Sequence, residues 1–413
     1  MKYERFISNR FLPKDRKGSA AHSPGYSGPL VSIATYSIAL GVLVMVTAVC
    51  ILRGFQGEIR QKVVGFGSHI VVQGYAMGNT YEETPVDIRR PEVERIRHTP
   101  GVRHVQFFAN KGGMIKTDDQ IHGIILKGVG EEFDTSFFAS NLVEGRLFQF
   151  PADKPSNEVV ISRTVSDKLG LQVGDKVRAY FWQEGAARAR AFEVCGIYNT
   201  DLADFDEHYV VGDLRQVQRL NGWDSNQVAG YEVLVDDFAR LDQTAQRLLE
   251  QLGYELTLTT VVAKNPALFS WLDLLDSNIV LIITIMMLVC VVSIISALLI
   301  MIFEKTSTIG ILKALGVDNS GIRRILLLKA VGIVGKGILL GDAVALLLCG
   351  LQWRFRLLRL DSASYSMDAV PIDLNGWIFV LVSIGALAVC LAAMLIPAAY
   401  ISNIHPAKTI KFD

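Results

Sequence analysis

This chain of 413 residues has no overall charge bias, no histidine pattern typical of a metal site, and few cysteines that could form disulfides. Its 41 basic and 41 acidic side chains give a formal net charge of +0, so composition offers no argument for a nucleic-acid partner. The 7 histidines are scattered, with no pair at metal-ligand spacing, and we expect no metal site and no cofactor. Only Cys195 lies between residues 56 and 272, which excludes a disulfide within that segment.

Motifs for nucleotide binding and nucleophilic catalysis are also missing. Residues 332–337 combine glycines with Lys336, but the first glycine of a phosphate loop and the Ser/Thr after the lysine are absent. This segment also lies in an apolar run instead of following a strand, and the chain has no Gly-x-Ser-x-Gly elbow. We therefore expect a protein that is not an enzyme and that takes its energy from a separate subunit.

Charge is absent from several long stretches, and these predict membrane spans. Half of the residues are hydrophobic and the mean hydropathy is +0.32. Residues 30–52 and 278–303 carry no charged side chain, and about 20 apolar residues in a helix cross a bilayer core. We expect four transmembrane helices, at residues 29–55, 273–303, 325–352 and 374–402. The second is long enough to cross with some tilt or to project beyond the lipid as a continuous helix.

Three charged residues fall inside the third predicted span, Lys329, Lys336 and Asp342, and of these Lys336 and Asp342 are the costly two. A charge at the bilayer centre costs at least about 2.5–3.5 kcal/mol on insertion scales. The two residues point about 240° apart around a helix, so they do not pair on one straight face. A proton or ion path is one explanation; a partner on a neighbouring helix, or snorkelling of Lys336, is the other.

Basic residues beside the spans predict the orientation. The leader, residues 1–28, and the connection at residues 304–324 are rich in Lys and Arg, whereas the loop at residues 353–373 is mixed and the tail, residues 403–413, is weakly basic. We place both termini and the 304–324 connection in the cytoplasm, and the 353–373 loop and residues 56–272 outside. A cleaved signal peptide is the alternative for the N-terminus, but its apolar core would be only about 7–15 residues long.

The outer segment, residues 56–272, predicts an α+β domain, which makes the whole chain an α-helical membrane protein with a large extracytoplasmic α+β domain between its first and second transmembrane helices. Helical patterns at 91–98, 162–169 and 238–252 lie between strand-like runs, and the last of them places Leu241, Ala245, Leu248, Leu249 and Leu252 on one face. We expect one or two lobes, with a split near residues 129–156. The expected strands are 69–73, 102–108, 113–116 paired with 121–126, 158–161, 177–181, 191–197, 209–211 and 231–235.

Residues 304–316 predict an amphipathic helix at the inner membrane surface. Ile309, Leu312 and Leu315 fall near one face, lysines lie elsewhere, and Gly316 ends the helix. Such a helix can dock on a partner or lie passively among lipid headgroups, and the pattern leaves both open.

This segment resembles the coupling motif of permeases in the MacB/FtsX-type ABC superfamily. More narrowly, residues 52–60, 67–70, 144–147, 158–162, 169–175 and 365–371 are similar to the lipoprotein-releasing permeases of the LolC/LolE family, and residues 396–400 and 405–407 fit the superfamily's closing pattern. The resemblance covers nearly the whole chain. There are two departures: Thr308 stands where the coupling motif usually has Glu, and residues 182–190 are shorter than the hook by which LolC-like subunits recruit a soluble carrier.

The resemblance implies a permease subunit in the bacterial inner membrane. It would pair with a second copy or a paralogue, sit on cytoplasmic ATPases similar to LolD, and draw lipoproteins from membrane lipid toward a periplasmic carrier. Two other functions stay open: a MacB-like efflux permease, and an FtsX-like transmembrane regulator of cell-wall hydrolases.

The resemblance also implies two sets of site residues. The ATPase-coupling set is Glu304, Lys305, Thr308, Ile309, Gly310, Leu312, Lys313, Leu315 and Gly316. The set that contacts acyl chains is Ala48, Ile51, Leu52 and Phe55 on the first span with Leu281, Ile285 and Leu288 on the second. Ordinary helix packing explains these apolar residues equally well.

Overall fold

The computed structural model describes residues 27–75, 83–117, 120–151, 154–183, 186–360 and 367–400. Contacts divide the chain into a helical unit, made of Met1–Gln56, Leu272–Arg359 and Ala369–Asp413, and a mixed unit, made of Gly57–Trp271 with Leu360–Asp368. The tail, nearly all of the predicted leader, and the motif residues Tyr365, Ser366 and 405–407 lie outside the described residues.

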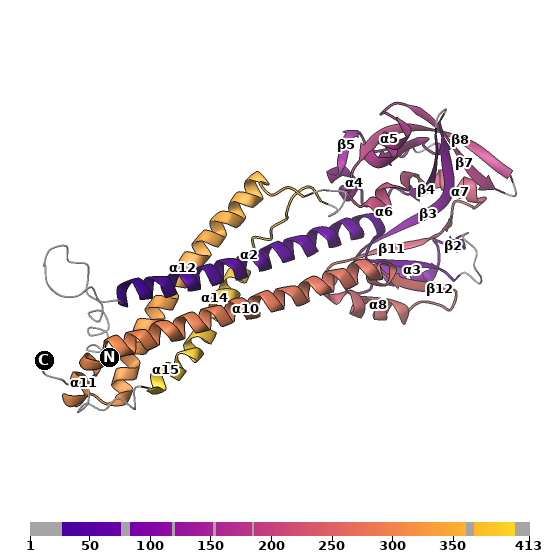
Figure 1. Ribbon diagram of the computed structural model, residues 1–413. Coiled ribbons are helices and arrows are strands. Elements are labelled where there is room, and N and C mark those ends of the chain that lie inside the picture. The colour runs from indigo at the N-terminus through magenta and orange to yellow at the C-terminus, as the bar shows by residue number, and fades with distance from the viewer. Residues whose placement is uncertain are drawn as a thin grey trace. The chain divides into compact units, whose positions relative to one another are not determined.

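Among the described residues, 4 helices are long and apolar enough to cross a membrane. They are α2 (Ser27–Gly67), α10 (Pro266–Glu304), α12 (Asn319–Phe355) and α14 (Gly376–Ala393), as Figure 1 shows. At about 1.5 Å per residue, the 39 residues of α10 extend about 58 Å, so this helix is longer than a bilayer core, as the sequence predicts. The helix α15 (Leu395–Tyr400) follows α14 after a break, because Pro397 has no N–H to donate to residue 393.

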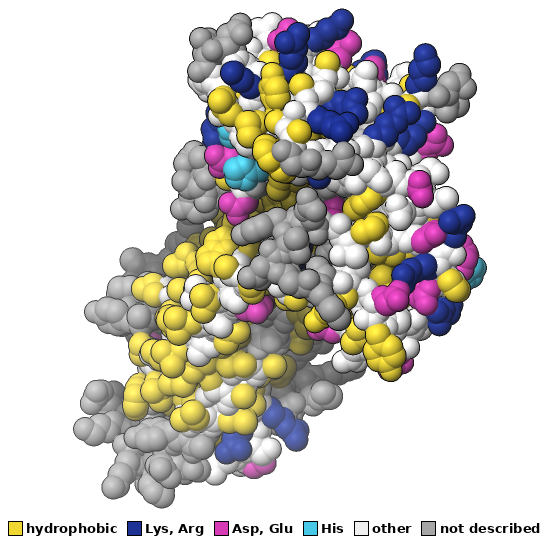
Figure 2. Space-filling view, turned by 90° about the vertical axis from the view of Figure 1, so that its right-hand side faces the viewer, with side chains coloured by type: hydrophobic (Ala, Val, Ile, Leu, Met, Phe, Trp, Pro, Cys, Tyr) yellow, Lys and Arg dark blue, Asp and Glu magenta, His cyan; other side chains and the backbone are white. Residues whose placement is uncertain are grey.

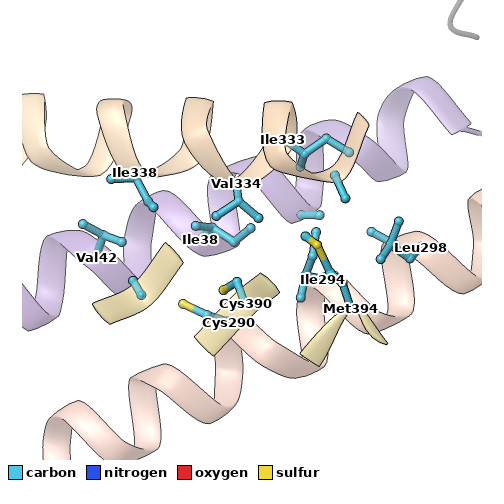
Figure 3. Close-up of a cluster of buried hydrophobic side chains, with 14 of the residues drawn as sticks. Ile38, Val42, Cys290, Ile294, Leu298, Ile333, Val334, Ile338, Cys390 and Met394 are labelled. Atoms are coloured by element: carbon cyan, nitrogen blue, oxygen red, sulfur yellow. The ribbon is translucent and has the colours of Figure 1, made fainter. Parts of the chain in front are cut away.

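The core of the helical unit lies where these helices meet. At Gly41 an added Cβ would lie 2.4 Å from Sγ of Cys290, so α2 and α10 approach closely there. Figure 3 shows side chains from four helices turned toward one another; its labelled residues are Ile38, Val42, Cys290, Ile294, Leu298, Ile333, Val334, Ile338, Cys390 and Met394. Cys50 and Cys349 are buried in the same core.

The mixed unit is built on one 10-stranded sheet in the order β12-β1-β11-β3-β4-β9-β6-β8-β5, with β7 pairing with both β3 and β8. β4 with β9 and β6 with β8 run parallel; the other pairs are antiparallel. The strands are β1 (Ile70–Gly74), β3 (Val102–Lys116), β4 (Ile121–Val129), β5 (Leu142–Gly145), β6 (Glu158–Ser162), β7 (Lys176–Gln183), β8 (Ala186–Tyr198), β9 (Tyr209–Asp213), β11 (Gly230–Val235) and β12 (Leu256–Thr260); β2 (Val86–Asp87) and β10 (Gln227–Val228) form a separate pair.

Short helices flank this sheet (Figure 1). They are α3 (Pro91–Arg97), α4 (Ser136–Ser140), α5 (Arg163–Leu169), α6 (Ala203–Asp206), α7 (Leu214–Asn221), the 3-10 helix η1 (Phe238–Arg240), α8 (Leu241–Leu249) and α9 (Val261–Lys264). The ends of α5 follow from its sequence: Oγ of Ser162 accepts a hydrogen bond from N of Val165, and Gly170 has a φ of 65°.

Several sequence predictions for this unit need correction. The expected strands 102–108 and 113–116 are one strand, β3, because Gly112 and Gly113 continue the pairing with β4. The two-lobe alternative is wrong, since β4 pairs with β9 and β9 with β6, which joins the segments on both sides of residues 129–156 in one sheet. The helix α8 ends at Leu249, whose side chain is exposed, so Leu249 does not belong to the buried face.

Candidate transport and coupling site

The candidate acyl-chain positions on α2 are mostly covered by the chain itself. Leu52 is 8% exposed, and Ala48, Ile51 and Phe55 are half-buried. They recur at helical spacing along one side of α2, next to the fully buried Cys50. This degree of burial fits ordinary helix packing and contact with acyl chains equally well, so both alternatives stay open for these four residues.

The candidate positions on α10 are different, because nothing in the described chain covers them. Leu281, Ile285 and Leu288 are exposed, and the spacing of four and three residues puts them on one face. Only 11% of the most apolar window of α10 is buried, against 33–44% for the other three spans. Figure 2 shows hydrophobic side chains over most of the visible described face of the helical unit. This apolar face of α10 is free to contact lipid, cargo or a second chain.

Two of the motifs that carry the family resemblance meet in the helical unit. An added Cβ at Gly54 would lie 2.7 Å from both C and O of Pro371, so only glycine lets the chain near Pro371 cross α2 at this point. N of Asp373 also donates a hydrogen bond of 3.1 Å to O of Cys50. The segment before α14 is thereby fixed against α2 within one turn of Leu52.

One glycine of the rejected phosphate-loop segment, Gly337, has a packing role. Residues 332–337 lie inside α12, where an added Cβ at Gly337 would lie 2.8 Å from Cγ2 of Ile38. Four residues later, an added Cβ at Gly341 would lie 2.6 Å from O of Ala39. Small residues at this spacing let two membrane helices approach closely, so Gly337 and Gly341 form the contact of α12 with α2.

Lys336 and Asp342 do not pair with each other in the described chain. Lys336 is exposed, whereas Oδ2 of Asp342 accepts a hydrogen bond of 2.7 Å from Oγ of Ser383 on α14. Asp342 therefore has the partner on a neighbouring helix that the sequence left as one explanation. Its buried Oδ1 has no partner among the described residues.

The coupling segment forms α11 (Thr306–Ala314), which packs through one edge on the helical core. Ile309 is fully buried and Gly310 is buried, whereas Thr308 is exposed and Leu315 is 76% exposed. Leu315 is therefore not on the face of Ile309, because it is the C-cap residue of α11, beyond the last helical turn.

The remaining coupling positions lie around this helix. Gly316 has a φ of 89° and ends α11, as the sequence predicts. Leu312 and Lys313 are half-buried, and before the helix Nζ of Lys305 lies 3.7 Å from Oε1 of Glu304. The exposed part of α11 and its C-cap thus combines a hydroxyl at Thr308 with a large apolar side chain at Leu315.

Sequence reasoning missed two buried ion pairs that hold the last turns of α2 in the mixed unit. Nζ of Lys62 lies 3.2 Å from Oδ2 of Asp201, with both side chains at most 12% exposed. Nζ of Lys127 lies 2.6 Å from Oε1 of Glu232 and donates to O of Phe66, at the C-terminal end of α2. A single lysine in a helix, such as Lys62, or in a strand, such as Lys127, gives no pattern to search for, because its partner is far away in the sequence.

Comparison with known proteins assigns the chain to a family. Residues 32–251, more than half of the chain, match the model of the MacB-like periplasmic core domain. The chain belongs to this family. Residues 280–406 match the FtsX-like permease C-terminal model, which makes the chain a permease of the MacB/FtsX type and a membrane protein with a periplasmic domain.

Two relatives agree with this assignment. The permease is 22% identical to the lipoprotein-releasing system transmembrane protein LolE of Haemophilus influenzae, over 92% of this chain and 95% of that one. It is also 22% identical to the lipoprotein-releasing system transmembrane protein LolC of Xylella fastidiosa, over 98% of both chains. The periplasmic region of MacB from Actinobacillus actinomycetemcomitans gives a TM-score of 0.35 at 13% identity, over 50% of this chain and 95% of that one.

Proposed function

We propose that this permease extracts lipoproteins from the inner membrane and passes them toward a periplasmic carrier. The observation that carries the proposal is its similarity to LolE and LolC over at least 92% of its length. In this proposal residues 56–272 form the periplasmic domain, inserted between the first and second spans, and both termini are cytoplasmic. Energy comes from a separate cytoplasmic ATPase.

Pairing of two permease chains, as copies or paralogues, is part of the proposal. It is supported by the exposed face of α10, where Leu281, Ile285 and Leu288 have no cover within the described chain. An acyl chain gains about 0.8 kcal/mol for each methylene that it buries, so an apolar cleft lined by this face and by α2 of the other chain could hold lipidated cargo. ATPase closure would then empty the cleft.

A photo-crosslinker at Ile285 tests the cargo path. We expect it to capture lipoprotein in the complex with its ATPase before ATP is added, and to lose this product after ATP hydrolysis. Leu339 on α12 is the matched control, because it is also exposed and apolar but lies outside the candidate set. Crosslinks only to neighbouring helices, unchanged by ATP, would contradict lipoprotein extraction and favour efflux or regulation.

We propose that the ATPase docks on α11. The exposed Thr308 and Leu315 support this, because a docking helix needs side chains that its own chain leaves uncovered. Glu304 takes the acidic role that Thr308 does not supply. Glu304→Lys and Leu315→Glu should lower ATP-driven cargo release in proteoliposomes without reducing membrane insertion.

Leu357→Glu is the control for this experiment, because Leu357 is 62% exposed and follows α12 at the predicted periplasmic end. It should leave the coupling of release to ATP hydrolysis unchanged. Normal coupled release in both Glu304→Lys and Leu315→Glu would remove the docking assignment.

Where the second permease chain is a paralogue, carrier recruitment is assigned to it in this proposal. β7 and β8 pair as far as Gln183 and Ala186, which leaves residues 184–185 alone to connect them. Such a connection supplies no long hook. Capture of the periplasmic carrier by the purified chain without its pairing partner would contradict this division of roles.

A further inference from the structure

A cavity of about 550 Å³ lies in the mixed unit and is lined by none of the candidate cargo or coupling residues. Its wall combines the last turns of α2 with residues of β3, β11, α4 and η1. At Gly65 an added Cβ would lie 2.2 Å from the ring of Phe137, so α2 and α4 are in close contact where they form this wall. Any occupant would touch the helix end and the sheet together.

The lining of this cavity is positively charged. It contains two guanidinium groups, from Arg60 and Arg103, and a single carboxylate, from Asp134. Asp134 already has partners, since its Oδ2 lies 3.7 Å from Nη2 of Arg103 and its Oδ1 accepts a hydrogen bond of 3.1 Å from N of Ser136. Hydrogen bonding from Ser136 holds the pKa of Asp134 below its ordinary value, so this carboxylate is ionised and leaves one guanidinium unbalanced.

Arg60 supplies that unbalanced charge. Its Nε is buried and has no hydrogen-bond partner among the described residues. Its guanidinium carbon lies 4.9 Å from the centre of the Phe238 ring, a contact that holds the charged plane in place. No carboxylate among the described residues pairs with this guanidinium, so its charge is available to an anion that enters the cavity.

His69 adds a neutral donor to the same lining. N of Val235 donates to its Nδ1 over 3.3 Å, which puts the imidazole proton on Nε2. Burial and the nearby charge of Arg103 lower the pKa of His69 to about 4, so the ring is neutral at pH 7. Together with Arg60 and Arg103 it presents N–H groups to a ligand that has only acceptors.

We propose that this cavity binds an anionic phosphate ester with a small organic substituent. A guanidinium fork matches phosphate oxygens in pairs, and two such groups with a neutral N–H donor fit a phosphate better than a neutral ligand. A water molecule takes about 30 Å³ of liquid volume, so a cavity of about 550 Å³ has room for a substituent such as glycerol. Both a lipid headgroup and a free phosphate ester have this chemistry. The site stands independently of the cargo proposed above.

The test uses the full chain in nanodiscs of a phosphate-free glycolipid, with hydrogen exchange of residues 57–67 and 134–140 as the readout. One arm adds glycerol 3-phosphate, and the other replaces the glycolipid by phosphatidylglycerol. We expect slower hydrogen exchange of these residues in at least one arm. Protection in the first arm alone identifies a free phosphate ester as the ligand, and protection in the second arm alone identifies a lipid headgroup. Protection in both arms identifies a site that accepts either ligand.

Substitutions show whether the cavity is responsible. Arg60→Gln and Arg103→Gln should each raise the half-saturating ligand concentration about tenfold or more, because each removes a charge-assisted contact. Arg60→Lys keeps the positive charge but not the paired N–H groups of the guanidinium. Its half-saturating ligand concentration should lie between those of wild type and Arg60→Gln, which separates ligand binding from a folding defect. Arg89→Gln is the control, since Arg89 is exposed and paired with Asp87 outside the cavity. No protection in either arm, or equal binding by all four variants, would overturn the proposal.

Discussion

Replacement of Lys127 by methionine should destabilise the mixed unit by about 3–5 kcal/mol. Its Nζ lies 2.6 Å from Oε1 of Glu232 and 2.7 Å from O of Phe66, and both side chains of the ion pair are 4% exposed. Without the ammonium group, the carboxylate of Glu232 keeps one hydrogen-bond donor among the described residues, Nε2 of Gln106 at 2.8 Å. The carbonyl O of Phe66 loses its hydrogen bond from Nζ of Lys127. Removing one member of a buried ion pair costs about 3–5 kcal/mol.

Two details place the effect near the lower end of that range. Nζ of Lys127 lies 5.5–5.8 Å from the ring centres of Phe66, Phe108 and Phe133, and methionine suits this place because it is apolar and its sulfur makes favourable contacts with aromatic rings. The pKa of Lys264 is lowered by burial and by the charge of Lys127, so removing Lys127 also relieves a like-charge repulsion. We therefore expect about 3 kcal/mol for Lys127→Met.

Native-state hydrogen exchange of the full chain measures this effect, through the opening free energy of amides in β3, β4 and β11. The double variant Lys127→Met/Glu232→Gln should be more stable than the sum of the two single changes by about 1–3 kcal/mol, since it no longer contains an unpaired buried charge. Lys116→Met is the control, because Lys116 is an exposed residue at the end of β3. The reasoning is refuted if the amides of β3, β4 and β11 have the same opening free energy in Lys127→Met as in Lys116→Met.

Three further predictions concern other contacts. Burial raises the pKa of Asp206 to about 6 from 3.8, so the folded state binds this proton more tightly than the unfolded state. Stability should therefore fall by about 3 kcal/mol in all as the pH rises from below 3.8 to above 6, and Asp206→Asn should remove this slope in hydrogen exchange around α6. Gly337→Ala should destabilise the helical unit by about 1–3 kcal/mol, which can be measured on heating by the reaction of its buried cysteines with a thiol-reactive dye. Gly335→Ala should not destabilise this unit, because an added Cβ at Gly335 meets nothing within 4 Å. Ser162→Ala should cost α5 about 1–2 kcal/mol in the exchange of its amides, because Oγ of Ser162 caps N of Val165.

The membrane helices could be predicted from the sequence because the absence of charge over about 20 residues is a local signal. Their ends could not be predicted as well. α2 continues to Gly67 and α12 begins at Asn319, well outside the expected spans, because helical hydrogen bonds continue where hydropathy has already changed. Hydropathy reports the solvent around a helix, whereas its length depends on capping residues such as Asp318, whose side chain accepts from N of Gly321.

In the mixed unit, sequence patterns located most strands but not their order. Alternation of apolar residues identifies a strand such as β9, yet its parallel pairing with β4 joins residues more than 80 positions apart. The short helices α4 and α6 were missed because 5 and 4 residues are too few to show a helical period. Buried pairs such as Lys62 with Asp201 depend on that same long-range order, so no local pattern predicts them.

The residues that carry the family resemblance act mainly on the fold, and this limits what the resemblance says about function. Gly54 permits the approach of Pro371, and in the 144–147 motif Gly145 has a φ of 78° while Arg146 pairs with Glu158 of another motif. Such residues specify how the chain folds, and a permease with a different cargo needs the same contacts. Cargo choice must instead depend on side chains that the fold leaves uncovered. The exposed face of α10 at Ile285 is therefore a more informative place to test lipoprotein extraction than any of the motifs.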